Sequence, residues 1–157
     1  MTVEGLVECE TAGSNLSQQI LLPYGSELIR EYSLANTRRS LVEGLEFVDE
    51  TKLLLSSGSF GGFLDLVEIN EEDEIEMLSN TQIESQYFGE GVTSVNGKTY
   101  LLTWRARKVL VFNTTDLLEN PNNRAQYEVR QLPEPLEQGW GLSHDSNGLL
   151  YMTDGTN

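Results

Sequence analysis

The chain of 157 residues is strongly acidic, with 25 Asp and Glu residues against 10 Lys and Arg and a formal net charge of −15. This balance argues against nucleic acid as a partner, because phosphate contacts need Lys and Arg, and equally against docking on an anionic membrane surface. No apolar run is long enough to span a membrane, and the acidic N-terminus does not resemble a signal peptide, so the sequence does not assign a compartment. Cys9 is the only cysteine, which excludes an internal disulfide and a thiolate metal site.

Residues 1–22 carry no clear pattern, whereas residues 27–32 alternate apolar and polar side chains and predict a strand. Two sets of four strands follow, predicted over 44–48, 52–57, 63–69 and 74–78, then over 91–95, 98–104, 108–113 and 126–132. Asn96-Gly97 predicts a tight hairpin inside the second set. Helical periodicity is absent almost everywhere, and Thr114 is expected to begin a turn. A third set starts near Gly139 and the sequence ends within it, which predicts a chain truncated at its C-terminus.

The strand pattern repeats, with Gly44, Gly91 and Gly141 aligned at spacings of 47 and 50 residues. Self-similarity near this period is typical of β-propeller blades. We therefore predict an all-β fold of the propeller type, with about two and a half blades and an N-terminal strand that closes the ring. The partial propeller domain is expected to cover residues 23–157.

Glu90 lies between two glycines, after an aromatic residue and just before a predicted strand. The flanking glycines allow a ligand to approach the backbone closely. Burial by Phe88 and Trp104 is expected to raise the pKa of the Glu90 carboxyl, which suits a general acid or base near neutral pH. In the alternative interpretation, the Gly-Glu-Gly turn only starts a strand, and Glu90 hydrogen-bonds backbone amides.

Trp104 and Trp140 occupy comparable places in successive units and are candidates for the wall of a pocket, the alternative being ordinary packing between blades. His144 is predicted to lie in a polar turn with Asp145 and to be exposed to solvent. One histidine without partners cannot form a zinc site, so no metal ligands are predicted. Neither a glycine-rich phosphate loop nor a GxSxG motif is present, which disfavours a Ser-His-Asp hydrolase.

The order of motifs resembles the plant and bacterial type of glutaminyl cyclase, a family of five-bladed β-propellers. The resemblance runs from about residue 27 to 157 and is carried in order by EGLEF, LLLSSGSFG, YFGEGVT, LLTWRARKVLVF, GWGLSHD and LYMTDGT. It implies a glutaminyl-peptide cyclotransferase, an acyltransferase that converts the N-terminal glutamine of peptides or proteins to pyroglutamate and releases ammonia.

The resemblance also assigns roles to single residues. Glu90, in the FGEG motif, would transfer the protons, and Phe88, Trp104 and Trp140 would line the substrate pocket. The family needs no catalytic metal or other catalytic cofactor, although its ring can hold a structural calcium ion in the central channel. Its members are often secreted.

One departure from the family lies where an FTQGL-like motif is expected, because Leu41 and Glu43 replace its aromatic residue and its substrate-binding glutamine. Glu43 is expected either to accept a hydrogen bond from the substrate amine or to weaken activity by adding a second carboxylate near Glu90. The second possibility supports an alternative function, a catalytically inactive propeller that acts as a binding module. A metal-dependent lactonase is a third hypothesis, and the missing ligand set speaks against it.

Overall fold

The computed structural model describes residues 6–9, 18–21, 30–32, 41–119 and 126–156. The chain separates into two compact units, Met1–Tyr32 and Ser33–Asn157.

The first unit contains a two-stranded antiparallel sheet of β1 (Leu6–Cys9) and β2 (Gln18–Leu21), with Leu6 opposite Leu21. This sheet lies in a segment where the sequence predicted no element. The strand predicted over residues 27–32 does not extend through residues 30–32, and its first half lies outside the described residues. Alternation over six residues is a weak signal, since a strand also needs a neighbouring strand to complete its hydrogen bonds.

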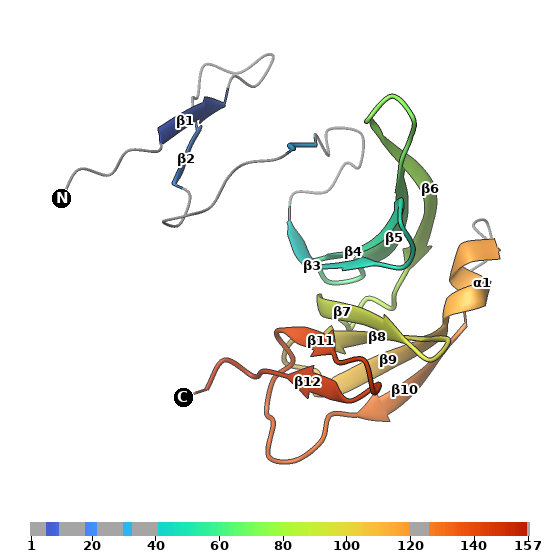
Figure 1. Ribbon diagram of the computed structural model, residues 1–157. Helices are drawn as coiled ribbons and strands as arrows, with labels where there is room; N and C mark the ends of the chain where they lie inside the picture. The colour runs from blue at the N-terminus through green and yellow to red at the C-terminus, as the bar shows by residue number, and fades with distance from the viewer. Residues whose placement is uncertain (1–5, 10–17, 22–29, 33–40, 120–125, 157) are drawn as a thin grey trace. The chain divides into compact units, whose positions relative to one another are not determined.

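The second unit begins with a four-stranded antiparallel sheet in which neighbours along the chain are neighbours in space (Figure 1). Its strands are β3 (Val42–Phe47), β4 (Lys52–Ser57), β5 (Phe63–Ile69) and β6 (Ile75–Gln82). The bounds of β4 and β5 match the predicted ranges. β6 runs further than its predicted range of 74–78, because its later residues pair with β5, beyond a register shift at Leu66 and Val67, as far as Gln82 opposite Phe63.

The second sheet repeats this plan with β7 (Gly89–Val95), β8 (Lys98–Thr103), β9 (Lys108–Asn113) and β10 (Tyr127–Gln131). The hairpin predicted at Asn96-Gly97 is confirmed, since Val95 pairs with Lys98 across it. A shorter antiparallel pair follows, β11 (Leu142–His144) and β12 (Leu150–Met152). The all-β class is therefore confirmed. Among the described residues the sheets do not close into a barrel, and the five-bladed ring stays a prediction.

A short helix, α1 (Thr114–Glu119), replaces the turn predicted from Thr114. The Asn113 side chain caps its N-terminus, accepting a hydrogen bond from the backbone nitrogen of Thr115 at 3.0 Å. Leu117 is buried and anchors the helix to the core. A helix of six residues presents only one or two turns to the core, so its hydrophobic periodicity is too short to recognise in the sequence.

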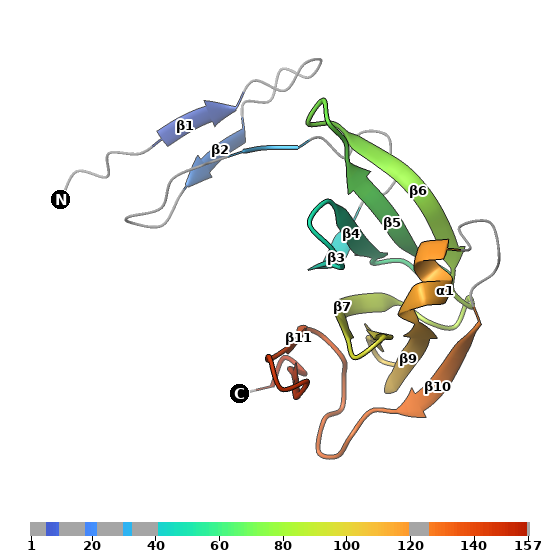
Figure 2. The same ribbon diagram turned by 45° about the vertical axis from the view of Figure 1, so that its right-hand side comes forward.

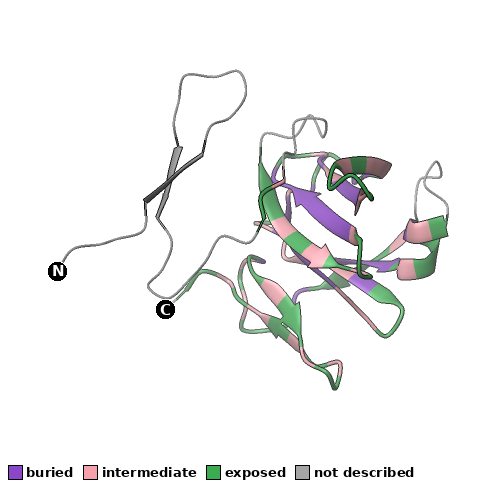
Figure 3. Cartoon of the chain, turned by 45° about the horizontal axis from the view of Figure 1, so that its top comes forward, coloured by how far each residue is buried: buried purple, intermediate pink, exposed green. Residues whose placement is uncertain are grey.

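The core is formed by the central strands of both sheets, where buried residues are concentrated (Figure 3). Its largest cluster joins Leu54 and Leu64 of the first sheet to Leu101, Leu110 and Phe112 of the second. Each such side chain contributes about 1.5–3 kcal/mol when fully buried. One shared core therefore fixes the two sheets against each other.

The aligned glycines mark the points where successive sheets meet. β7 contacts both β3 and β11, and it lies between them in both ribbon views (Figure 1 and Figure 2). A Cβ atom on Gly44 would lie 2.6 Å from the carbonyl oxygen of Glu90, and one on Gly91 would lie 2.6 Å from the backbone nitrogen of Leu142. The repeat of glycine in the sequence therefore reflects close backbone approach at two equivalent contacts.

Replacing Gly91 by alanine should lower the free energy of unfolding by about 2–3 kcal/mol, because the new Cβ would collide with backbone atoms that cannot rotate away. Urea unfolding measures this effect. Gly141→Ala is the matched control, since the nearest atom there is the rotatable hydroxyl of Thr153 at 2.9 Å. Equal losses of stability in the two variants would contradict the close contact at Gly91.

Candidate active site

Glu90 lies in an irregular part of β7, at its contact with the neighbouring strands. Gly89 pairs with Thr103 and Val92 pairs with Leu101, so Glu90 and Gly91 fall where the register shifts. On one side the Ser56 hydroxyl donates a hydrogen bond to the Glu90 carbonyl oxygen. On the other side, the Gly91 nitrogen donates to the Trp140 carbonyl oxygen at 2.8 Å. The backbone that carries the Glu90 carboxylate is therefore held from both neighbouring sheets.

The Glu90 side chain is buried, with 7% of the residue exposed. Burial raises the pKa of its carboxyl, and the negative charge of Glu43 raises it further, from an ordinary value of 4.5 to about 7. The predicted increase of the pKa by desolvation is thus confirmed. A carboxyl with this pKa is present in both its protonated and its ionised form at neutral pH, as an acid/base group requires.

No donor among the described residues hydrogen-bonds the Glu90 carboxylate. Only the backbone of Glu90 takes part in the contacts described above. This arrangement argues against the alternative in which Glu90 serves as a turn residue bonded to backbone amides, because such bonds would favour the ionised carboxylate and lower its pKa.

Phe88, two residues before Glu90 in the chain, packs against Trp104. Their ring centroids are 5.4 Å apart with the planes tilted by 56°, and the Trp104 nitrogen donates to the Phe88 carbonyl oxygen at 3.1 Å. The Trp104 indole nitrogen is buried and has no hydrogen-bond partner in the part of the chain that the structure describes. Leaving such a buried donor unpaired costs about 1–3 kcal/mol.

Trp140 and Glu43 are placed less deeply. The Trp140 backbone contacts Gly91, but its side chain is 44% exposed, packs on the backbone of Gly155 and donates from Nε1 to Gln138 at 3.3 Å. Glu43 is exposed and its side chain lies over Gly58. Its negative charge contributes to the raised pKa of Glu90.

Two residues near the site were missed by the sequence analysis. The ring of Phe60 packs edge-on against Phe88, with centroids 5.5 Å apart, and the guanidinium carbon of Arg105 lies 4.0 Å from the centre of the Trp104 ring. Phe60 is an aromatic residue in the glycine- and serine-rich segment SSGSFGG, and this unusual composition was the available signal. Arg105 had none beyond its position next to Trp104.

His144 is exposed, as predicted, but it ends strand β11 and does not lie in a turn. Its Nδ1 lies 2.8 Å from the Thr93 hydroxyl and 3.5 Å from Glu46 Oε1. The Thr93 hydroxyl is also 3.0 Å from Glu46 Oε1. These three residues come from β11, β7 and β3, so they link all three sheets of the second unit.

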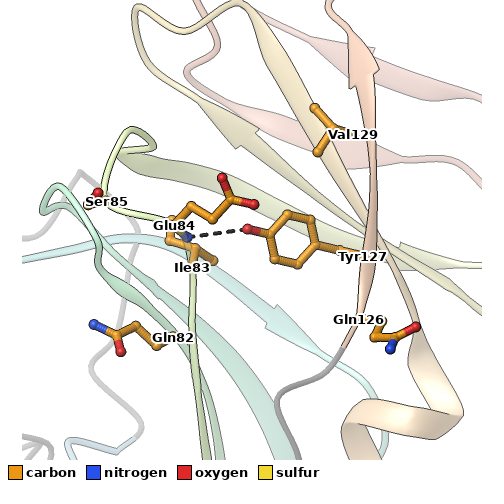
Figure 4. Close-up of a pocket in the computed structure, with 7 residues that line it drawn as sticks. All are labelled: Gln82, Ile83, Glu84, Ser85, Gln126, Tyr127 and Val129. Atoms are coloured by element: carbon orange, nitrogen blue, oxygen red, sulfur yellow. Dashed lines mark hydrogen bonds between the residues drawn. The ribbon is translucent and has the colours of Figure 1, made fainter.

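A separate cavity of about 680 Å³ lies at the outer strands, away from the predicted site residues (Figure 4). It is lined by residues 82–85 at the end of β6 and by Gln126, Tyr127 and Val129. The Tyr127 hydroxyl already accepts a hydrogen bond from the Glu84 nitrogen at 3.2 Å. Its only carboxylate is exposed, so this cavity lacks the buried acid/base group that Glu90 supplies.

Within the described residues, no group of three or more His, Cys, Asp or Glu side chains is arranged to hold a metal ion. The structural calcium ion implied by the resemblance therefore gains no side-chain ligand set here and stays a prediction. In the same part of the chain, no helix has the length and apolar character needed to cross a membrane.

Comparison with known proteins identifies one family. The family described as Glutamine cyclotransferase matches residues 3–157, nearly the whole sequence. No curated protein matches the chain.

Proposed function

Because the chain belongs to the glutamine cyclotransferase family, we propose that it converts the N-terminal glutamine of peptides or proteins to pyroglutamate. The observation that supports this reaction best is Glu90, a buried carboxyl with a pKa of about 7, two residues after Phe88 in the chain. The α-amine of the substrate attacks the carbonyl carbon of its own side-chain amide. A carbon–nitrogen bond closes the five-membered ring, and the bond to the departing amide nitrogen breaks to release ammonia.

In this proposal Glu90 carries the protons. Its ionised form takes a proton from the attacking amine, and its protonated form gives one to the leaving nitrogen. Because the attack is intramolecular, the protein needs mainly to hold the reactive rotamer of the glutamine side chain. The pKa of about 7 allows the same carboxyl to serve both steps without a large energetic penalty near neutral pH.

The aromatic residues complete the site. Phe88, Trp104 and Trp140 supply apolar surface, which lowers the pKa of the substrate ammonium group and frees the nucleophile.

The test is direct. The full chain is incubated with a peptide that starts with glutamine, and ammonia release is followed together with the loss of its mass from the peptide. Formation of pyroglutamate at a rate above the spontaneous reaction supports the proposal. Bound but unreacted peptide would instead support the second candidate function, a binding module. The extra carboxylate of Glu43 favours this candidate, because its charge shifts the pKa of the Glu90 acid/base group.

Replacing Glu43 by glutamine should lower the pKa of Glu90, because it removes the negative charge that opposes ionisation there. Burial is the larger cause of the raised pKa of Glu90, so removing the Glu43 charge should have a modest effect. We expect the acid limb of the plot of kcat/KM against pH to move to lower pH by less than about one pH unit. A pH–rate profile of both proteins measures the shift. An unchanged acid limb, or one that moves up, would contradict the coupling of the two carboxylates.

A further inference from the structure

Phe60, Phe88 and Trp104 form a row of three rings, which we call the aromatic row. Neighbouring centroids are 5.5 Å apart between Phe60 and Phe88 and 5.4 Å apart between Phe88 and Trp104. Both spacings lie in the range at which aromatic rings attract each other. Phe88 stands two residues before Glu90, so the row extends the candidate active site towards Phe60.

Only Phe60 has much of its surface free. Arg105 covers one face of Trp104, and Phe88 is packed between the other two rings. Phe60 is 63% exposed, the largest exposed fraction among the large apolar side chains of the described residues. An exposed aromatic ring that continues the wall of a half-buried site is suited to bind an apolar group of a ligand.

The backbone holds Phe60 firmly in this position. Phe60 and Phe88 form an antiparallel bridge, and the Gly61 nitrogen donates to the Tyr87 carbonyl oxygen at 3.1 Å. Gly61 has a φ of +64°, a conformation that favours glycine, so the turn presents Phe60 at a defined place. The ring is thus part of a built surface, not the tip of a free loop.

We propose that Phe60 is a specificity-determining residue that packs against the side chain of the substrate's second residue and favours a large apolar one. This inference rests on the proposed function, in which the first residue lies at Glu90. Successive residues of an extended peptide are spaced by roughly 3.3–3.6 Å, so the second residue lies within one ring spacing of the reacting glutamine. Phe60 is the exposed ring of the row, 5.5 Å from Phe88, which stands two residues before Glu90.

The experiment compares two peptides that differ only in the second residue, Gln-Phe and Gln-Gly. We expect wild-type kcat/KM to favour Gln-Phe by about tenfold, as one good aromatic contact supplies. Phe60→Ala should bring this ratio close to one, mainly by lowering kcat/KM for Gln-Phe. Phe60→Leu, which keeps apolar bulk and protects the fold, should retain part of the preference.

Phe47→Ala is the matched control, because Phe47, at the end of β3, is a phenylalanine that is 54% exposed but lies outside the aromatic row. It should leave the ratio unchanged. A ratio that survives in Phe60→Ala, or falls equally in Phe47→Ala, overturns the inference. Equilibrium binding of both peptides, followed by tryptophan fluorescence, separates the two proposals. Binding with a Phe60-dependent preference but without ammonia release would overturn the proposed reaction and support the Phe60 subsite. Cyclisation without this preference would support the proposed reaction and overturn the Phe60 subsite.

Discussion

Glu90→Gln is expected to lower kcat/KM for pyroglutamate formation by a factor of about 10²–10⁴, the contribution typical of a positioned acid/base group. The amide keeps the size of the side chain but can neither accept a proton from the amine nor donate one to the leaving nitrogen in the same way. Since no described donor hydrogen-bonds the carboxylate, the replacement breaks no such bond and should leave the fold intact. Ammonia release and circular dichroism measure the two effects.

Glu84→Gln is the control for this loss, because Glu84 is an exposed carboxylate that lines the separate outer cavity. Its backbone nitrogen, which contacts Tyr127, is not altered by the substitution. The Glu84 variant should retain wild-type turnover. Near wild-type activity in Glu90→Gln, or an equal loss in both variants, would remove Glu90 from the mechanism.

The repeat of the strands could be predicted from the sequence because it depends on local chemistry. Alternating side chains defined β5, and Asn96-Gly97 defined a hairpin whose turn needs those residues. The glycine spacing was also informative, since a side chain at Gly44 or Gly91 would collide with the backbone of the next sheet. The glycine spacing therefore indicated the close contact between sheets, in addition to the strands themselves.

The arrangement around Glu90 could be predicted only in part. Desolvation of its carboxyl followed from its aromatic and glycine neighbours, and the effect of Glu43 followed from the family resemblance. Phe60 is 28 residues before Phe88, and the residues between them include two strands, so only the folded chain brings the two rings together. The absence of a hydrogen-bond partner for the Trp104 indole N–H among the described residues could not be predicted either, because hydrogen-bond partners depend on tertiary distances.

The raised pKa of Glu90 also makes a prediction about stability. Below about pH 4.5 the carboxyl is protonated in both the folded and the unfolded chain, so it has no effect on the free energy of unfolding. Between this value and about pH 7, the unfolded chain releases the proton while the folded protein keeps it. The folded state then binds more protons, and stability falls as the pH rises.

Glu90→Gln removes this titration and should therefore stabilise the protein above pH 7. The gain over wild type should grow from near zero below the unfolded pKa to about 3 kcal/mol above the folded pKa, following the shift from 4.5 to about 7. Urea unfolding at several pH values measures the difference. Phe47→Ala, whose side chain does not titrate, should give a difference from wild type that is constant with pH.

A difference between Glu90→Gln and wild type that stays flat, or shrinks as the pH rises, would mean that the Glu90 carboxyl ionises in the folded protein as easily as in the unfolded chain. That result would also weaken the catalytic proposal, because both rest on the same burial. A variant that gains stability above pH 7 and loses turnover would instead show that the protein keeps a costly buried carboxyl where the reaction needs one. Burial of the Glu90 carboxyl would then lower stability and raise activity.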